Sequence, residues 1–225
     1  MTIWFASGNV HKKAELAAIF KESPAGREPR NYGQEEIRIR IPSDAGIAFC
    51  PREDAESFTG NALIKARALF SIVREPVIAD DSGLCVDVLG GRPGIYSARY
   101  TGRYKGKASL DAAERNVLLL EELGDAGKRS ARFVCAMAVV YGEERFFTVQ
   151  ESLEGEIISG MERARGTGGF GYDPVFLLPE RGLTLAELSA EEKNATSHRG
   201  KAGRIAAAMI GLVMREGGLD QSSGI

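Results

Sequence analysis

The sequence predicts an α/β fold built on a mixed sheet. Short apolar runs alternate with stretches of helical apolar spacing in the first half of the chain, and two longer apolar runs around Gly142 have the pattern of a hairpin. Hydrophobic residues make up 44% of the 225 residues, which is enough to bury a core. The length fits one large domain or two small ones tightly joined, and we find no internal repeat or linker.

The first half is expected to alternate strands and helices. The predicted elements are a strand at Ile3–Ala6, a helix that follows Ser7-Gly8-Asn9, a loop at Ser23–Tyr32, a half-buried strand at Glu36–Ile41 ended by Pro42, a helix at Phe58–Val73 closed by Pro76, and a strand at Val77–Ala79. The last strand leads directly into Asp80-Asp81-Ser82-Gly83, which we predict to be a turn.

The second half is expected to contain the hairpin and the closing helix. The predicted elements are a long loop at Gly90–Gly106, a helix at Leu110–Leu123, a hairpin of Arg132–Tyr141 and Arg145–Ser152, a glycine-dense segment at Gly155–Asp173, a strand at Val175–Leu178, a helix at Leu185–Lys193, and an amphipathic helix at His198–Arg215. The last residues, Asp220–Ile225, are expected to be a frayed tail.

Composition and charge narrow the class of protein. With 29 basic and 31 acidic residues the formal net charge is −2, which argues against a nucleic-acid or anionic-membrane partner. Cys50, Cys85 and Cys135 are an odd number without a C-x-x-C pair, so neither a disulfide framework nor a structural zinc site is supported. The N-terminus lacks the pattern of a signal peptide, and no apolar stretch is long enough for a membrane span. We therefore expect a cytoplasmic protein.

Ser7-Gly8-Asn9-Val10-His11-Lys12 lies where a strand is expected to pass into a helix. Backbone N–H groups at the positive end of that helix could cradle a phosphate, with Lys12 adding a mobile charge. The alternative is a simple helix cap in which Asn9 is the N-cap and Lys12 is solvated. The residues alone leave both readings open.

Asp80 and Asp81 follow a strand that should be buried, which places carboxylates where open α/β sheets bind ligands. Adjacent residues of an extended chain point to opposite faces, so at most one of the two should address a given pocket while the other braces the turn. A hard cation such as Mg²⁺ prefers one or two carboxylates together with phosphate oxygens. A plain Asp-Ser-Gly turn is the alternative.

Two further segments suggest a ligand. Gly166–Pro174 surrounds Phe170 and Tyr172 with glycines, so the backbone can approach a ligand closely while either aromatic ring stacks on a planar base. Lys193–Lys201 brings Lys193, His198 and Arg199 to the expected start of the last helix, where positive charge opposes the helix dipole and is better explained by an anion or polar ligand. A capped helix start at Ser197 with a solvated basic patch is the alternative.

Taken together and in order, these segments resemble the HAM1/RdgB-like inosine triphosphate pyrophosphatases. The resemblance extends from Ile3 to about Arg204 and is carried by Ser7–Leu16, Ser57–Ala68, Ile78–Tyr100, Gly166–Phe176 and Leu188–Ala202. It implies an elongated mixed sheet in one domain with two lobes, a nucleotide cleft between them, and a homodimer. It also implies Mg²⁺-dependent cleavage of ITP, dITP and XTP to the monophosphate and pyrophosphate.

The resemblance also implies a role for each matching residue. Asp81 would be the catalytic, metal-linked residue that activates water, and Ser82 would help to hold the substrate. Ser7, Gly8, Asn9, Val10, His11 and Lys12 would cradle phosphate. Phe170, Gly171, Tyr172 and Asp173 would hold the base and its surroundings, Lys193 would contact the substrate, and His198 and Arg199 would read the 6-oxo edge of the purine. Donors that are left unpaired by a 6-amino group would discriminate against ATP.

The sequence departs from the family pattern near the second metal contact. Arg52 stands where members often have a glutamate, so Glu53 is the substitute metal ligand, and Asp80 is the alternative. Gly60 stands before Asn61 in place of a usual glutamate, and Ser7 replaces a frequent threonine but keeps the hydroxyl.

Three alternatives to this reaction stay open from the sequence. One is a hydrolase that releases the γ-phosphate instead of pyrophosphate. Another is a purine-nucleotide sensor without turnover, suggested by the change at Arg52. The third is a nucleic-acid protein that uses the locally basic middle loop with Arg92, Arg99, Arg103, Lys105 and Lys107, although the overall charge disfavours it.

Overall fold

The computed structural model describes residues 1–22, 37–101 and 110–215. The strands are β1 (Thr2–Phe5), β2 (Arg38–Arg40), β3 (Val77–Val86), β4 (Ser130–Val140), β5 (Phe146–Ile157), β6 (Phe176–Leu178) and β7 (Leu183–Thr184). The α-helices are α1 (Val10–Glu22), α2 (Phe58–Val73), α3 (Ala112–Leu123), α4 (Ala190–Thr196) and α5 (His198–Arg215). Short 3₁₀ turns lie at Pro42–Ala45, Asp87–Leu89, Gly94–Arg99, Met161–Arg163, Asp173–Val175 and Leu185–Glu187.

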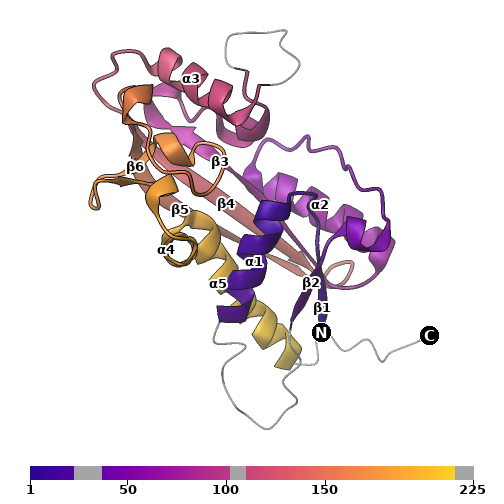
Figure 1. Ribbon diagram of the computed structural model, residues 1–225. Coiled ribbons are helices and arrows are strands. Elements are labelled where there is room, and N and C mark those ends of the chain that lie inside the picture. The colour runs from indigo at the N-terminus through magenta and orange to yellow at the C-terminus, as the bar shows by residue number, and fades with distance from the viewer. Residues whose placement is uncertain (23–36, 102–109, 216–225) are drawn as a thin grey trace, which may run out of the picture. The chain divides into compact units, whose positions relative to one another are not determined.

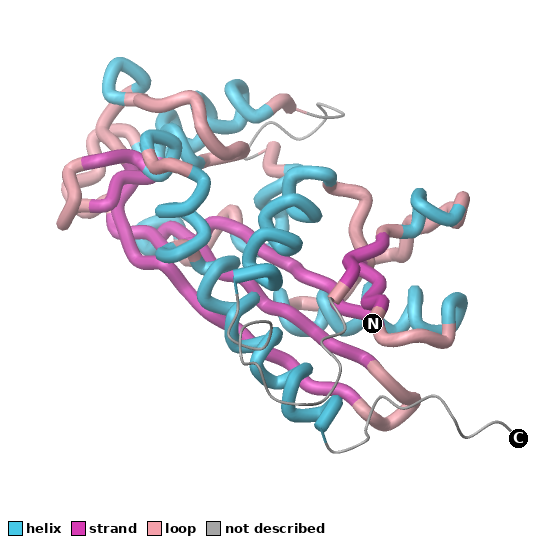
Figure 2. The backbone as a smooth tube through the Cα atoms, turned by 60° about the horizontal axis from the view of Figure 1, so that its bottom comes forward, coloured by secondary structure: helices cyan, strands magenta, loops and turns pink. Residues whose placement is uncertain are grey.

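The described strands form one mixed sheet, which confirms the predicted fold class. Seven strands from these residues follow the order β2-β1-β3-β4-β5-β6-β7. β1 pairs in parallel with β2 and β3, whereas β6 pairs antiparallel with β5 and β7. The expected hairpin is present as β4 and β5, which are neighbours in the sheet and run side by side in Figure 2.

The chain divides into two compact units. The first unit comprises Met1–Asp81, Cys135–Glu151 and Arg199–Ile225, and the second comprises Ser82–Val134 and Ser152–His198. β3, β4 and β5 therefore each contribute residues to both units. The nucleotide cleft implied by the resemblance stays a prediction.

The sheet of the first unit is covered by helices on both faces (Figure 1). Ile3, Phe5 and Ile78 pack in one core cluster with residues of α1 and α5, while Trp4, Val77 and Ala79 pack in another with residues of α2. This split follows from the strand period of two, which sends successive side chains to opposite faces. The same alternation decides where the next residues of β3 point.

The second unit has a core of its own. Leu119, Leu120 and Leu123 of α3 pack with Leu84 and Val86 and with apolar residues of β5 and β6. α3 begins at a capping box in which Asp111 accepts from the Glu114 N–H at 2.8 Å and Glu114 accepts from the Asp111 N–H at 2.9 Å. Two reciprocal bonds satisfy helix donors that would otherwise lack partners, so the predicted helix at Leu110–Leu123 begins two residues later than expected.

One sequence prediction is wrong at a place that matters for the site. Asp80-Asp81-Ser82-Gly83 is not a turn, because β3 continues without a break from Val77 to Val86. The turn prediction relied on Gly83, yet Gly83 does not have a positive φ and the segment is one continuous stretch of extended chain. Phe5 at the end of β1 pairs with Ile78, so the two aspartates still lie beyond the carboxyl end of the parallel neighbour.

Other boundaries differ in smaller ways. The predicted helix at Leu185–Lys193 is two pieces, a 3₁₀ turn and α4, because Ser189 is the N-cap of α4 and accepts from the Glu192 N–H at 3.1 Å. Lys193 therefore lies in α4 and not at the start of α5. The predicted strand at Glu36–Ile41 is three residues long as β2. The expected loop at Ser23–Tyr32, the tail at Asp220–Ile225, and positions 102–106 of the middle loop lie outside the described residues.

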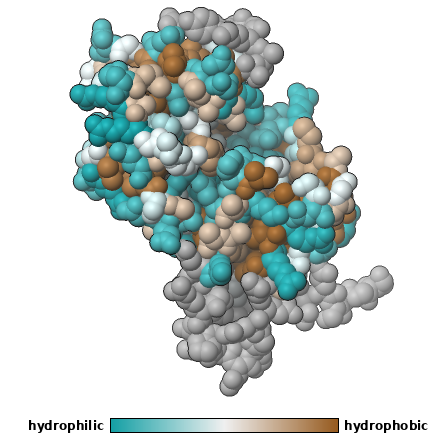
Figure 3. Space-filling model, viewed as in Figure 1, coloured by the Kyte–Doolittle hydropathy of each residue, from teal (hydrophilic) through white to brown (hydrophobic). Residues whose placement is uncertain are grey.

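In the part of the chain that the structure describes, no helix is long and apolar enough to cross a membrane. On the face seen in Figure 3, hydrophobic residues occur in small groups among hydrophilic ones. Cys50, Cys85 and Cys135 are all free thiols, in agreement with the absence of a predicted disulfide framework.

Candidate active site

Asp80 lies at the centre of a buried ion-pair network in the first unit. Its side chain is 1% exposed, and its oxygens accept from Lys12 Nζ of α1 at 2.9 to 3.0 Å and from Arg199 Nη2 of α5 at 3.0 Å. Arg199 Nη1 also donates to Glu15 Oε2 of α1 at 2.7 Å. Asp80 has the same strand parity as Ile78, so it points to the face covered by α1 and α5.

This network keeps Asp80 ionised. Burial alone raises the pKa of Asp80, but the positive charges of Lys12 and Arg199 outweigh it and hold the pKa well below its ordinary value. The same contacts keep the pKa of Arg199 above its ordinary value despite its burial. Lys12 is thus held by Asp80, in contrast to the mobile charge expected from the sequence.

Asp81 points to the opposite face, toward α2. Its Oδ1 accepts from Lys65 Nζ at 3.1 Å and its Oδ2 from Asn61 Nδ2 at 3.4 Å. Lys65 Nζ also donates to Glu53 Oε2 at 3.0 Å, so the two carboxylates converge on one ammonium group. Arg52 instead faces solvent with a side chain that is 87% exposed and pairs with Asp54. Glu53, and not Arg52, therefore joins the Asp81 cluster.

The two neighbouring aspartates have opposite pKa shifts. Burial raises the pKa of Asp81, and the opposing attraction of Lys65 is too weak to cancel it. The pKa of Lys65 is raised, because Asp81, Asp80 and Glu53 together outweigh the effect of burial. A carboxylate of raised pKa next to one of lowered pKa is the arrangement in which one group can exchange a proton while the other stays charged.

The donor set of this cluster fits a hard cation. Among the residues described, no group of three or more His, Cys, Asp or Glu side chains is placed to hold a metal ion. Mg²⁺ does not need one, since it is commonly held by one or two carboxylates with the remaining positions filled by water and substrate phosphate. Asp81 and Glu53 share a single positive charge on Lys65, and this pair of carboxylates fits that requirement.

The turn between β1 and α1 has the geometry of a helix cap. Asn9 Oδ1 accepts from the backbone N–H groups of His11 at 3.0 Å and Lys12 at 3.2 Å, and the Asn9 N–H donates to Ser7 Oγ at 3.1 Å. Asn9 is thus a cap, as the second reading expected, but Lys12 is not solvated as that reading also expected, because its side chain is 16% exposed and paired with Asp80. Binding of phosphate by Ser7, Gly8, Val10 and their neighbours stays a prediction.

In the second unit, the glycine-rich segment is folded around Asp173. Asp173 Oδ2 accepts from the Phe170 N–H and from Lys193 Nζ, both at 2.8 Å, and Lys193 Nζ lies 4.9 Å from the centre of the Phe170 ring. Gly169 has φ +71°, and a Cβ there would lie 2.0 Å from Asp173 Oδ2. Glycine at this position lets the backbone pass close to the carboxylate, so three predicted site residues are brought together.

The two aromatic residues of the segment have different environments. Tyr172 is buried in the core of the second unit and its Oη donates to the Ser97 carbonyl at 3.1 Å. Phe170 is half-buried, so it is the ring with a face available for stacking. Gly171 is fixed through its carbonyl, which accepts from Asn116 Nδ2 of α3 at 3.1 Å.

The remaining predicted residues are also placed. His198 is 4% exposed, and its ring stacks on Phe133 with centroids 4.8 Å apart and an angle of 10°. It belongs to the second unit, whereas its chain neighbour Arg199 belongs to the first. Ser82 follows Asp81 in β3 and is half-buried.

Sequence reasoning missed Lys65 and Glu15. Lys65 is 8% exposed on the same helix as the core residues Ala62, Ala66 and Leu69. A lysine among the apolar positions of an amphipathic helix must find a carboxylate if it is buried, and that signal was present. Glu15 offered no such signal, because a charged residue on an amphipathic helix is normally solvated.

Comparison with known proteins places the chain in a family. The model of the Ham1 family matches residues 3–209. The chain belongs to the Ham1 family. Among its relatives is a protein of Treponema denticola named dITP/XTP pyrophosphatase, which is 47% identical over 90% of this Ham1 chain and 94% of its own length.

A second relative of the same name, from Geobacillus kaustophilus, is 44% identical over 89% of both chains. The solved structure of a HAM1 protein from Coxiella burnetii superposes with a TM-score of 0.76 at 34% identity, and covers 96% of this chain and 99% of that one. Both kinds of comparison span nearly the whole Ham1 chain, so the fold and the family are shown together.

Proposed function

We propose that this protein is a nucleoside triphosphate pyrophosphatase that hydrolyses non-canonical purine nucleotides, namely dITP, ITP and XTP, to the monophosphate and pyrophosphate. The relatives named dITP/XTP pyrophosphatase support the substrate class. The observation that carries the chemistry is the convergence of the Asp81 and Glu53 carboxylates on Lys65 Nζ, at 3.1 and 3.0 Å, next to the ion-paired Asp80. Removing non-canonical nucleotides from the pool is the cellular role that this activity serves.

Asp81 is the proposed general base. A carboxylate with a raised pKa is a better proton acceptor than an exposed one, because its basicity lies closer to that of the water it must deprotonate. Its Oδ1 is held by Lys65 and its Oδ2 by Asn61, so its orientation is fixed before a substrate arrives. Lys65 also offers a positive charge that favours negative charge developing on phosphate oxygens.

Mg²⁺ is the proposed cofactor, held by Asp81 and Glu53. When bound, the ion would neutralise phosphate charge and lower the pKa of a coordinated water. Lys65 pairs with both carboxylates but offsets only one of their two negative charges. Its side chain would have to release at least one of them to the ion, and four rotatable bonds allow that movement.

The other predicted residues keep the roles that the resemblance implies. Ser7, Gly8, Asn9, Val10, His11 and Lys12 would contact phosphate, and Ser82 would help to hold the substrate. Phe170 would stack on the base, Gly171 and Tyr172 would contribute main-chain contacts, and Asp173 would orient Lys193 toward the substrate. His198 and Arg199 would present donors to the 6-oxo group. A 6-amino group would leave such donors unpaired, which disfavours ATP.

The test is turnover of dITP, ITP and XTP beside dATP and dGTP, with Mg²⁺ present and then removed by a chelator. Monophosphate, pyrophosphate and phosphate are scored separately by chromatography. We expect metal-dependent release of pyrophosphate from dITP, ITP and XTP, with dATP nearly untouched. Release of phosphate would instead indicate γ-cleavage. Tight nucleotide binding in calorimetry without any product would indicate a sensor, and either result would overturn the proposal.

The assembly and location are also proposals. A homodimer that binds neither nucleic acid nor membrane, in the cytoplasm, is implied by the resemblance and by the balanced charge. Arg92 and Arg99, which belong to the locally basic loop, contact Glu122 and the Tyr96 ring respectively, so both already have partners within the protein. Light scattering on the purified protein tests the dimer, and a salt-dependent DNA titration tests for nucleic-acid binding.

A further inference from the structure

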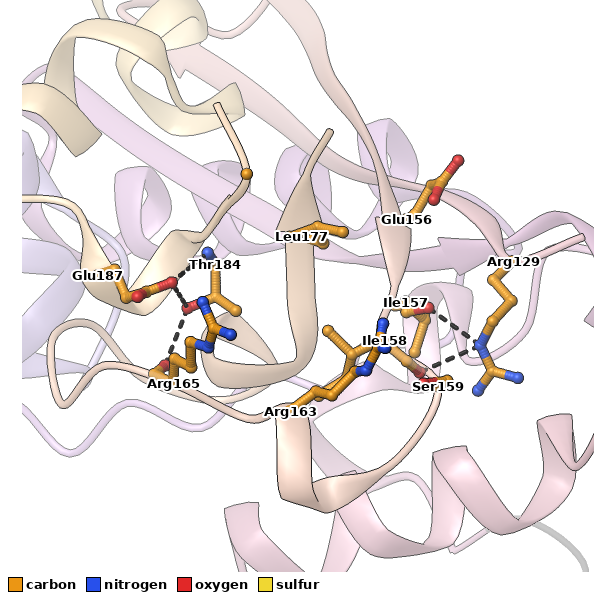
Figure 4. A pocket seen from close by; sticks show the side chains of 11 residues that line it. Arg129, Glu156, Ile157, Ile158, Ser159, Arg163, Arg165, Leu177, Thr184 and Glu187 are labelled. Carbon is orange, nitrogen blue, oxygen red and sulfur yellow. Dashed lines mark hydrogen bonds between the residues drawn. The ribbon is translucent and has the colours of Figure 1, made fainter. Parts of the chain in front are cut away.

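The second unit contains a pocket that none of the proposed substrate or metal residues lines. It has a volume of about 450 Å³ and is shown in Figure 4. Its walls come from the end of β5, from β6, from the 3₁₀ turns at Met161–Arg163 and Leu185–Glu187, and from the residue before β4. A pocket of this size is in the range that holds a small organic ligand.

Three arginines line this pocket without a carboxylate partner. In the part of the chain that the structure describes, no ion pair within 4.0 Å includes Arg129, Arg163 or Arg165. Figure 4 shows Arg163 between the other two. Arg163 and Arg165 are exposed and Arg129 is partly buried, and three guanidinium groups that line one cavity attract an anion to it.

Arg129 is fixed by the main chain. Its Nε donates to the carbonyls of Ile157 at 3.0 Å and Ile158 at 3.1 Å, and its Nη1 donates to the Gly124 carbonyl at 2.9 Å. Its Nη2 is buried and has no hydrogen-bond partner among the described residues. Carbonyl groups orient the guanidinium, and Asp125 attracts it electrostatically. The buried Nη2 still lacks an acceptor, and an unsatisfied buried donor of this kind calls for one.

Arg165 is positioned by its own backbone. Its N–H donates to the Pro174 carbonyl at 3.4 Å, and its carbonyl lies 2.9 Å from Thr184 Oγ1. Thr184 in turn is held by Glu187, whose Oε2 accepts from the Thr184 N–H at 2.7 Å. Glu187 is therefore held as a cap. It keeps its negative charge, so with Glu156 the lining has three positive and two negative side chains, a net charge of +1.

The lining also includes an apolar surface. Ile157 and Ile158 are buried at the end of β5, and Leu177 of β6 is half-buried beside them. Glu156, which pairs with Leu177 across the two strands, lies on the same side of the pocket as Arg129 in Figure 4. The arrangement suits a ligand with a phosphate at the arginines and a less polar part over the isoleucines.

We propose that this pocket is a second binding site, for a small phosphate-bearing molecule. The guanidinium groups of Arg163 and Arg165 would hold the phosphate oxygens through paired N–H groups, a geometry in which arginine surpasses lysine. Arg129 contributes fixed positive charge. The site is separate from the residues assigned to turnover, and it does not depend on the proposed reaction.

The test is calorimetric titration of the full chain with inorganic pyrophosphate in the absence of Mg²⁺. Arg163→Gln is the decisive variant, because the Arg163 side chain makes no hydrogen bond or ion pair with the described residues, and thermal unfolding checks that it folds as the wild type does. Arg181→Gln is the matched control, since Arg181 is also exposed in the second unit but pairs with Glu192 outside the pocket. The proposal expects at least a tenfold loss of one binding event in Arg163→Gln and none in Arg181→Gln.

Three results would overturn the proposal. Equal binding in Arg163→Gln and wild type would show that pyrophosphate does not use this pocket. An equal loss of affinity in Arg163→Gln and Arg181→Gln would show that pyrophosphate responds only to the net charge of the protein. Citrate binding as tightly as pyrophosphate would show that the pocket does not select phosphate. Turnover of dITP is measured on the same samples and tests the proposed function independently. A failure of the second-site proposal can therefore be told apart from a failure of the proposed function.

Discussion

Asp80 and Asp81 are consecutive residues of β3 whose carboxylates pair with lysines of different helices, Asp80 with Lys12 of α1 at 2.9 Å and Asp81 with Lys65 of α2 at 3.1 Å. Strand alternation alone produces this separation. It gives one aspartate two strong cationic partners and the other a single lysine shared with Glu53. The two residues are consequently expected to respond differently to the same substitution.

Asp81→Asn should abolish most turnover while leaving the fold intact. The amide cannot accept a proton, and loss of a general base typically costs about 10² to 10⁴ in rate. The measurement is dITP turnover beside thermal unfolding. Asp87→Asn is the control, because Asp87 is also an aspartate near β3 but is exposed and pairs with Arg132 at the surface. Wild-type turnover in Asp81→Asn would remove this residue from the mechanism.

Asp80→Asn should lower stability, which Asp81→Asn is not expected to do. Loss of the carboxylate leaves Lys12 and Arg199 without their shared buried partner, and breaking one side of a buried ion pair costs about 3 to 5 kcal/mol. Urea unfolding at neutral pH measures this loss. Asp44→Asn is the control, because Asp44 is exposed and pairs with Lys13, the neighbour of Lys12 in α1, and surface pairs contribute little. A loss of unfolding free energy no larger than that of Asp44→Asn would contradict the stabilising role of the ion pairs around Asp80.

The pH dependence of stability should reveal Asp80 as well. Its pKa in the folded protein is depressed below the ordinary 3.8, so the ionised carboxylate stabilises the fold above that pH, and this contribution is lost as the pH falls further. The difference in unfolding free energy between wild type and Asp80→Asn should therefore be constant near neutral pH and shrink below about pH 4. Asp81 is present in both proteins, so its contribution to the pH dependence cancels in the difference. If the difference in unfolding free energy between the two proteins did not depend on pH, the lowered pKa of Asp80 would be wrong.

The sequence predicted most of the fold because its periodic signals were strong. The predicted helix at Phe58–Val73 matches α2 at both ends, since Ser57 is an N-cap and Pro76 follows closely. The turn at Asp80-Asp81-Ser82-Gly83 failed because local propensity favoured a turn, whereas pairing in the sheet keeps the chain extended. A two-residue strand such as β7 carries too few residues for any period to be visible.

For the site, residue types were predictable but partners were not. The glycine-rich segment was identified, yet only the structure distinguishes Phe170, with an accessible ring, from Tyr172, which is part of the core. Lys12 and Asp80 are 68 residues apart in the chain, so no local pattern connects them. Ion pairs between distant segments depend on how helices dock on the sheet, and that information is absent from any short stretch of sequence.

Glu53→Gln should raise the Mg²⁺ concentration needed for half-maximal turnover, while Arg52→Gln should leave it unchanged. Glu53 is held by Lys65 next to Asp81, whereas Arg52 faces solvent. The amide keeps the shape of the side chain but is a weaker ligand for a hard cation. The measurement is a Mg²⁺ titration of dITP turnover in the three proteins. An unchanged Mg²⁺ requirement in Glu53→Gln would exclude Glu53 as a ligand and leave Asp80 as the alternative.

Gly169→Ala should impair substrate binding more than Gly171→Ala does. Both glycines have positive φ, +71° and +68°, so the backbone strain of an alanine is similar at the two positions. Only at Gly169 would the added Cβ collide, 2.0 Å from Asp173 Oδ2 and 2.9 Å from Lys193 Nζ, whereas at Gly171 nothing lies within 4 Å. The collision must displace Asp173 from Lys193 and from the Phe170 N–H, the contacts that shape this segment.

We therefore expect a rise in KM for dITP of about tenfold or more in Gly169→Ala relative to Gly171→Ala, with kcat less affected. Steady-state kinetics on both variants measure the two constants, and equal KM values would show that the Asp173 contacts do not position the base.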